Sequence, residues 1–122
     1  MIVVNSNAVE SVQTKDEIVG QGPVYRKVLA EPRDTGGYGI LLVTFAPGAK
    51  LNYHVHNSEQ ILFVTDGEGI VATPDEEKKV TPGTFILIKP GEVHWHGATE
   101  KSSFTHLAIQ KPGIRLAKPA KG

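Results

Sequence analysis

The chain has 122 residues, enough for one domain with a core of its own, and we expect a single domain over residues 1–122. Its 13 basic and 13 acidic side chains cancel, which argues against nucleic acid or an anionic membrane surface as a partner, and the lack of cysteine excludes disulfides and thiolate metal sites. The sequence has neither an apolar run of roughly 20 residues that could cross a bilayer nor a secretory signal at its start, so we expect a cytoplasmic protein.

The pattern along the chain is that of short strands separated by tight turns. Only the first segment, Asn7–Ile18, resembles a helix, and it is weak and polar. From residue 24 onward, runs rich in Val, Ile, Thr and aromatic residues lie between glycine and proline turns. The predicted strands are Val24–Ala30, Tyr38–Phe45, Gln60–Thr65, Gly69–Thr73, Thr84–Ile88 and Phe104–Gln110. Strands at this spacing predict an all-β sandwich or barrel, with the barrel over about residues 24–110.

Turn residues and bulky side chains add detail to this prediction. Asp66-Gly67 lies between two predicted strands and can supply the positive φ that a tight hairpin needs. The tail is expected to be mobile from about residue 114 to residue 122. The barrel core is expected to contain the bulky side chains Phe45, Phe63, Phe85, Ile86, Leu87 and Ile88.

All five histidines lie between residues 54 and 106, and four of them form two His-x-His pairs. Side chains alternate along a strand, so His54 and His56 share a face, as do His94 and His96. In a closed barrel one face of each strand is interior, and the strand with His106 could direct a further imidazole into the same cavity. Neutral imidazole binds Zn, Cu, Fe, Ni and Mn. One such pair is often no more than two surface histidines, but two pairs beside glycine turns favour a metal site.

Two stretches of the chain resemble the two sequence motifs of the cupin family. Residues 48–67 look like the first motif, with its glycines and its His-x-His pair in register. Residues 83–94 look like the second motif, which ends on His94. Lys89 stands where the family usually has a proline, and Ala98 where it usually has an asparagine; we interpret both as loop variation. The resemblance implies the cupin fold, an all-β double-stranded β-helix or jelly-roll barrel.

By this resemblance, a single metal ion is bound by His54, His56, Gln60 and His94. The carboxylate ligand of the family falls on Gln60, and the neighbouring Glu59 is the alternative. We favour Gln60 because it has the parity of the ligand histidines, whereas Glu59 points to the other face of a strand. An amide ligand is neutral, so the site would keep the full charge of the ion and favour an anion.

The C-terminal half of the chain is similar to small bacterial cupins that are manganese-dependent hydroxynitrile lyases. Residues 90–98 and 105–110 carry this similarity. It implies one divalent metal ion, with Mn favoured and Fe, Ni, Zn or Cu possible, and a small-molecule substrate. Small cupins also form dimers, often by exchange of N-terminal strands, so a homodimer through the apolar segment Met1–Val4 is expected.

The same similarity implies roles for residues that do not bind the metal. His96 and His106 become candidate acid–base groups, and Val43 and Gln110 become parts of the pocket wall. A second interpretation of the two histidines is that they only hydrogen-bond the ligands and fix their tautomers.

The function implied by the resemblance is a lyase acting on small carbonyl adducts such as cyanohydrins. The alternatives are an iron-dependent dioxygenase and a non-catalytic binder of a small sugar or acid, because one scaffold hosts many activities. His96 and His106 facing the metal across an open pocket would favour a catalyst, whereas Arg or Lys there would favour a binder. Arg26 and Lys27 lie on a predicted strand, but the sequence leaves open which of them faces the interior.

Overall fold

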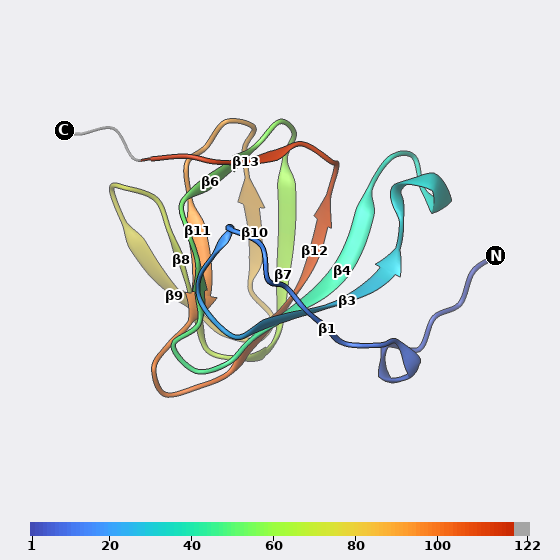
Figure 1. Ribbon diagram of the computed structural model, residues 1–122, viewed down its shortest axis with the longest axis horizontal. Coiled ribbons are helices and arrows are strands. Elements are labelled where there is room, and N and C mark those ends of the chain that lie inside the picture. Colours follow the sequence, from blue (N-terminus) through green and yellow to red (C-terminus); the bar gives the residue numbers. More distant parts are fainter. Residues whose placement is uncertain (119–122) are drawn as a thin grey trace.

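Thirteen short strands and two 3-10 helices make up residues 1–118, the part of the chain that the computed structural model describes (Figure 1). The 3-10 helices are η1 (Ser6–Ala8) and η2 (Pro32–Asp34). The strands are β1 (Val12–Gln13), β2 (Val19–Gln21), β3 (Val24–Ala30), β4 (Gly39–Phe45), β5 (Lys50–Leu51), β6 (His54–His56), β7 (Gln60–Gly67), β8 (Gly69–Ala72), β9 (Glu77–Val80), β10 (Phe85–Ile88), β11 (Trp95–Ala98), β12 (Phe104–Gln110) and β13 (Ile114–Leu116). All six predicted strands occur, with bounds shifted by at most two residues.

Two antiparallel sheets form the walls of the barrel. The larger sheet has the strand order β1-β3-β4-β12-β7-β10, and the smaller has the order β2-β5-β11-β8-β9. A two-stranded sheet of β13 and β6 completes the structure, and Figure 1 shows β13 crossing one end of the barrel. The all-β jelly-roll barrel predicted from the sequence is thereby confirmed.

The register of the larger sheet determines which side chains line the barrel interior. Residues paired on neighbouring strands point to the same face of a sheet. One interior row runs from Arg26 on β3 through Val43 on β4 to His106 on β12. The next row is apolar and at most 1% exposed, and it consists of Val24, Phe45 and Phe104. This apolar row closes the polar part of the interior on one side. The row of Arg26 and His106 is the first row of that polar part.

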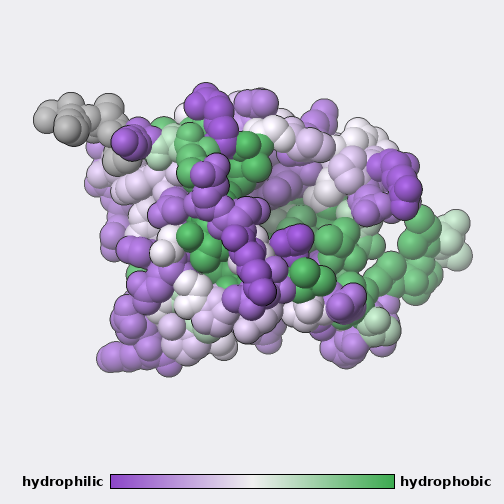
Figure 2. All heavy atoms as spheres, in the orientation of Figure 1, coloured by the Kyte–Doolittle hydropathy of each residue, from purple (hydrophilic) through white to green (hydrophobic). Residues whose placement is uncertain are grey.

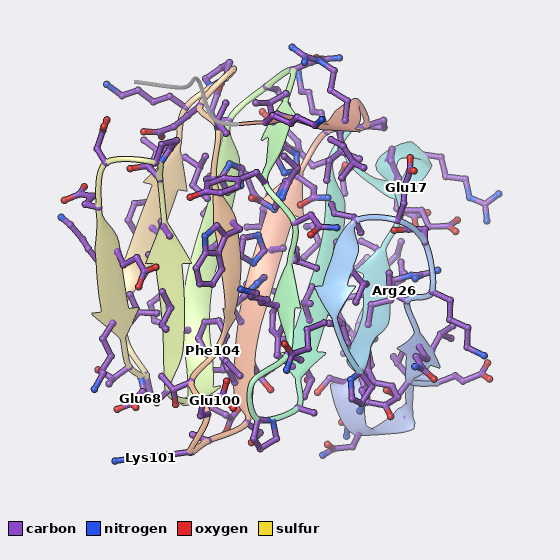
Figure 3. The ribbon with its side chains drawn as sticks, turned by 60° about the vertical axis from the view of Figure 1, so that its left-hand side comes forward. Glu17, Arg26, Glu68, Glu100, Lys101 and Phe104 are labelled. Atoms are coloured by element: carbon purple, nitrogen blue, oxygen red, sulfur yellow. The ribbon has the colours of Figure 1, made fainter. Side chains whose placement is uncertain are left out.

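The two ends of the barrel differ in character. Phe104 lies near one end, with Glu68, Glu100 and Lys101 beyond it (Figure 3). Glu17 lies toward the opposite end, which β13 crosses. The cavity inside the barrel reaches the surface at that end, because Glu17 and the residues of β13 line it.

The predicted barrel core is wrong in part. Phe45 and Ile88 are buried as expected, but Phe63, Phe85 and Leu87 are 42%, 60% and 50% exposed. The pleat explains the difference, because the even positions of β7 face the interior and its odd positions face outward. Phe63 is paired with Phe85 across the two strands, so both rings lie on the outer face.

The weak helical candidate Asn7–Ile18 does not form an α-helix. Apart from η1, the segment contains β1, an edge strand that pairs with β3. Beyond β1, the backbone N–H of Thr14 donates to the carbonyl of Val24 at 2.8 Å. A polar segment has no apolar stripe to bury as a helix, whereas pairing along a sheet edge satisfies its backbone groups.

The positive φ predicted at Gly67 is confirmed, but the tight hairpin predicted there is not, because β7 and β8 belong to different sheets. Gly67 has a φ of 74° and ends β7, two residues before β8 begins. A side chain at this position would collide with the carbonyl of Ser103. Glycine is therefore required here both for its backbone conformation and for the close approach of the neighbouring loop.

Both ends of the chain bear on earlier predictions. β13 pairs with β6 from Ile114 to Leu116, so the segment predicted to be mobile from about residue 114 begins as a strand; the rest of that prediction, residues 119–122, lies outside the described residues. The apolar residues Met1–Val4 are exposed, as Figure 2 shows at the right, and the homodimer stays a prediction.

No helix in the described part is long and apolar enough to cross a membrane, and the cytoplasmic location stays a prediction.

Candidate metal centre

Three buried histidines meet inside the barrel. His54 and His56 come from β6, and His94 directly precedes β11. The backbones of His54 and His94 bond to each other in both directions, with N–H to O distances of 2.9 and 3.1 Å. The three side chains are at most 3% exposed, and they can each offer one ring nitrogen so that all three lie within 4.8 Å of one another. This grouping is what a divalent metal ion requires.

The backbone fixes the tautomers of two of these rings. Nδ1 of His54 lies 2.8 Å from the carbonyl of Asn52, and Nδ1 of His94 lies 2.8 Å from the carbonyl of Glu92. A carbonyl oxygen can only accept, so Nδ1 carries the proton in both rings. The lone pair of each neutral ring is therefore on Nε2. Among the described residues Nε2 of His54 has no protein partner, as expected of a nitrogen that is directed at a metal.

Burial keeps the three rings neutral. It lowers the pKa of His54 to about 3 and that of His56 to about 4, with a smaller contribution in each case from the neighbouring His94. Burial also lowers the pKa of His94. A neutral imidazole is the form that binds metals, so the site needs no further deprotonation near neutral pH.

Gln60, the first residue of β7, presents its amide oxygen to the same point. Its side chain is 3% exposed, and its Nε2 donates to Oε1 of Gln110 at 2.5 Å. That bond turns Oε1 of Gln60 toward Nε2 of His94, 3.2 Å away. In this arrangement both atoms are acceptors when the proton of His94 is on Nδ1, and a cation held between them would bind to both. The neighbouring Glu59 is exposed.

The donor set therefore fits a divalent ion. It consists of three neutral imidazoles and one neutral amide oxygen, contributed by the four residues predicted as ligands. Such a set suits Mn, Fe, Zn, Ni or Cu, and it adds no charge of its own.

The two remaining histidines form a pair beside this group. Nε2 of His106 lies 3.0 Å from Nδ1 of His96, and both side chains are at most 2% exposed. Burial lowers the pKa of His106 to about 4, and burial together with the nearby His106 lowers the pKa of His96 well below its ordinary value. In the described part of the chain neither ring is hydrogen-bonded to a ligand histidine, and backbone carbonyls fix the tautomers of His54 and His94 instead.

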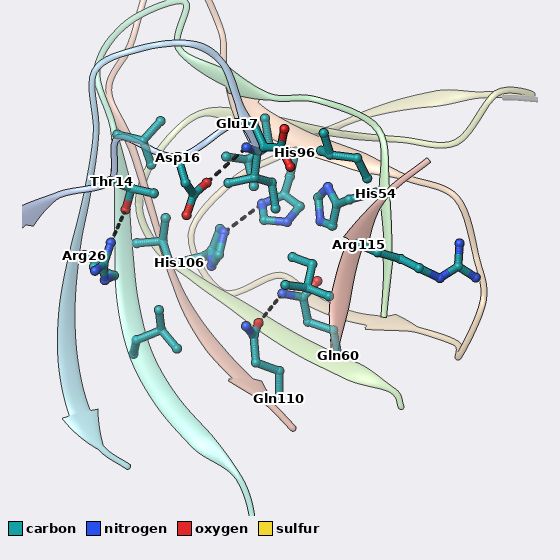
Figure 4. Close-up of a pocket in the computed structure, with 17 residues that line it drawn as sticks. Thr14, Asp16, Glu17, Arg26, His54, Gln60, His96, His106, Gln110 and Arg115 are labelled. Carbon is teal, nitrogen blue, oxygen red and sulfur yellow. Dashed lines mark hydrogen bonds between the residues drawn. The ribbon is translucent and has the colours of Figure 1, made fainter. Parts of the chain in front are cut away.

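A cavity of about 380 Å³ connects these groups to the surface, and Figure 4 shows the residues around it. Among the residues that line it are both members of the histidine pair and two of the predicted ligands, His54 and Gln60. Val43 and Gln110, which were predicted as pocket wall, also line it. The structure thus brings all the predicted site residues into one region of the barrel.

Sequence reasoning left the face of Arg26 open and missed several other residues of the cavity wall. Arg26 lines it from β3, Thr14, Asp16 and Glu17 line it from the connection between β1 and β2, and Arg115 lines it from β13. For Arg26 the local pattern offered no signal, because both faces of its strand carry apolar residues, Val24 and Val28 on one and Tyr25 and Leu29 on the other. The other residues are brought in by pairings that no local pattern reveals.

Comparison with known proteins identifies the family of the chain. The model of the Cupin domain matches residues 41–109, more than half of the chain. The chain belongs to the cupin family. The (R)-mandelonitrile lyase of Granulicella tundricola is 43% identical over 70 residues, which are 57% of this chain and 53% of that protein. This cupin therefore matches only about half the length of that relative.

Further comparisons found a second curated protein and solved structures with a similar fold. The L-ectoine synthase of Bordetella petrii is 26% identical over 91 residues, 73% of this cupin and 68% of that enzyme. A cupin-like protein from Thermotoga maritima superimposes with a TM-score of 0.82 at 25% identity, covering 93% of this chain and 90% of that one. The polyketide cyclase RemF of Streptomyces resistomycificus superimposes with a TM-score of 0.84 at 19% identity, covering 99% and 88%, and shows the shared fold.

The choice between the neighbouring candidates for the fourth ligand is testable. Gln60→Ala is expected to lower metal affinity by more than about tenfold, because even the loss of an outer partner of a ligand costs about 10–100-fold. Glu59→Ala removes an exposed side chain and is expected to leave the affinity unchanged. Elemental analysis after dialysis against metal decides this. Equal occupancies, or the larger loss in the Glu59 variant, would contradict the assignment.

Chelation provides a test of the whole group. A ligand that binds only the folded state stabilises it by about 2.7 kcal/mol at a hundred times its dissociation constant. EDTA is therefore expected to lower the melting temperature, and added Mn²⁺ to restore it, as thermal unfolding with and without metal would show. A variant that lacks His54 serves as the control and should not respond to EDTA. A melting temperature that chelation does not change would speak against a metal in the folded protein.

Proposed function

We propose that this cupin is a metal-dependent lyase that cleaves and forms small carbonyl adducts, with a cyanohydrin as the model substrate. The observation that carries the proposal is the buried pair of His96 and His106, which lines the same cavity as the ligand His54. The 43% identity to a mandelonitrile lyase supports it, and this identity extends over only about half of that enzyme.

His54, His56, Gln60 and His94 would hold the metal, for which we propose Mn²⁺. A bound divalent ion would supply electrostatic stabilisation of the anionic fragment that leaves. The neutral ligands leave the charge of the ion undiminished, which suits this task.

The histidine pair would move the proton. In a neutral pair one ring donates to the other, so one of the two outer nitrogens, Nδ1 of His106 or Nε2 of His96, carries a lone pair and the other a proton. Neither outer nitrogen has a protein partner in the described part of the chain. The pair can therefore accept a proton at one end while the other end holds one ready to donate.

In the proposed reaction the lone pair takes the hydroxyl proton of the cyanohydrin. The carbonyl forms as the bond to the nitrile carbon breaks, the electrons of that bond leave with cyanide, and the proton returns to give hydrogen cyanide. Burial favours the neutral state of both rings, so the base is available near neutral pH. General acid–base help of this kind is commonly worth about 10²–10⁴ in rate.

A non-catalytic binder of a small acid is the second candidate. It is favoured by Arg26, a cationic residue on the cavity wall. No comparable observation favours the dioxygenase.

The proposal is tested with the manganese-loaded protein and racemic mandelonitrile. Formation of benzaldehyde above the rate in buffer, with preference for one enantiomer, is the expected result, and EDTA should abolish it. Metal-loaded protein that binds small acids but does not release benzaldehyde would favour the binder. Consumption of O₂ with a catechol or a diketone in the iron-loaded protein would favour the dioxygenase instead.

A further inference from the structure

Arg26 is a cationic residue of the cavity that the proposed reaction does not use. It is paired with Val43 on the neighbouring strand, and Val43 is paired with His106 on the next. Paired residues share a face, so the side chain of Arg26 enters the barrel on the side of His106. Strands lie about 4.8 Å apart, which puts the backbones of Arg26 and His106 about 10 Å from each other. The arginine side chain spans part of this distance, and a small molecule bound in the remaining space can contact both residues.

Within residues 1–118 the guanidinium group has no acidic partner. Nη1 of Arg26 donates to Oγ1 of Thr14 at 2.8 Å, which is a neutral contact (Figure 4). No carboxylate oxygen of the described residues lies within 4.0 Å of this group. Asp16 and Glu17 line the same cavity but are exposed, and Oδ1 of Asp16 accepts the backbone N–H of Ile18. A half-buried cation without a counter-ion carries a desolvation cost that an anionic ligand would offset.

Arg26 is also held in place. Thr14 directly follows β1, and Val12 of β1 is paired with Arg26 itself. The strand pairing therefore fixes the position of the hydrogen-bond acceptor relative to Arg26. A guanidinium group with a fixed position has several N–H groups left, and its planar fork matches the two oxygens of a carboxylate.

We propose that Arg26 binds the carboxylate of the substrate, and that the substrate is a small carboxylic acid bearing the reacting hydroxyl or carbonyl group. This rests on the proposed function, because it places the reacting end at His106 in the same cavity. The volume of about 380 Å³ is at the lower end of the range for small-molecule sites, about 300–1,000 Å³, and admits an acid of the size of mandelate. A divalent ion held by neutral ligands would keep its full charge, which would strengthen the preference for an anion.

The test compares mandelate with the neutral mandelamide as probes of manganese-loaded protein by calorimetry. Wild type is expected to bind mandelate about 10–100-fold more tightly, as is typical of a hydrogen bond to a charged group. Arg26→Gln, whose amide can still donate to Thr14, should lose this preference, and Arg26→Lys should keep part of it. Arg115→Gln is the matched control, because it removes the same charge from a residue whose side chain extends away from the histidines (Figure 4).

Two results would overturn the proposal. One is equal binding of mandelate and mandelamide by wild type, which needs no variant to fold. The other is an Arg26→Gln variant that binds mandelate as tightly as wild type does while its metal content and circular dichroism are normal. The carboxylate would then bind elsewhere. A lack of mandelonitrile turnover contradicts only the proposed function, because the binding constants do not depend on catalysis.

Discussion

Replacing His106 with glutamine is expected to lower kcat for mandelonitrile cleavage by about 10²–10⁴ while the metal stays bound. Glutamine can keep a hydrogen bond to Nδ1 of His96, but it cannot take up a proton near neutral pH. His106 is not among the predicted ligands, and no ligand histidine is hydrogen-bonded to it in the described residues. The loss should therefore appear in kcat, with little change in KM, and elemental analysis should find a normal metal content.

Two further variants separate proton transfer from a structural role. His94→Ala should lose metal and activity together, because it removes a ligand. His96→Gln should resemble the His106 variant, since the two rings act as one unit, and the double variant should be little worse than either single one. Losses that multiply in the double variant, or a His106→Gln enzyme with wild-type kcat, would contradict the proton-relay role.

The metal group could be predicted from two kinds of information. A strand alternates its side chains, so the spacing of His54 and His56 on β6 already places them on one face. Gln60 and His94 lie on other segments and followed from the register of the two cupin motifs, and the structure has Gln60 buried and its neighbour Glu59 exposed. Where a function depends on residues a few positions apart, a single sequence carries the information.

The rest of the cavity could not be predicted because it depends on pairings between distant segments. Arg26 is brought to the side of His106 by two strand pairings, of β3 with β4 and of β4 with β12, and β13 is brought to the cavity by its pairing with β6. The outward position of Phe63 is a related case, because a bulky aromatic residue on a strand fits either face. Which face is interior follows from the register of the whole sheet, and that register is a long-range property.

The metal-free protein is expected to lose stability as the pH falls from about 6.5 to about 4. In the unfolded chain a histidine has its ordinary pKa of 6.5, whereas burial in the folded state lowers the pKa of His56 and His106 to about 4 and that of His54 to about 3. Below pH 6.5 the histidines of the unfolded chain therefore bind protons, whereas the buried histidines of the folded state do not. The free energy of unfolding then falls with falling pH, and the loss ends when the folded state takes up the same protons.

The expected loss is large for a small domain. Each such histidine contributes on the order of 1.4 kcal/mol per pH unit inside this window, whereas the whole free energy of unfolding is commonly about 5–15 kcal/mol. Urea unfolding in EDTA at several pH values across the window measures the slope, and chelation is needed because metal binding is itself linked to protons. His106→Gln removes one buried imidazole, so its slope should be shallower by about 1.4 kcal/mol per pH unit. A free energy of unfolding that is constant across the window would mean that these rings are not kept neutral in the folded protein, and the histidine pair would then not supply the neutral base that the proposed reaction requires.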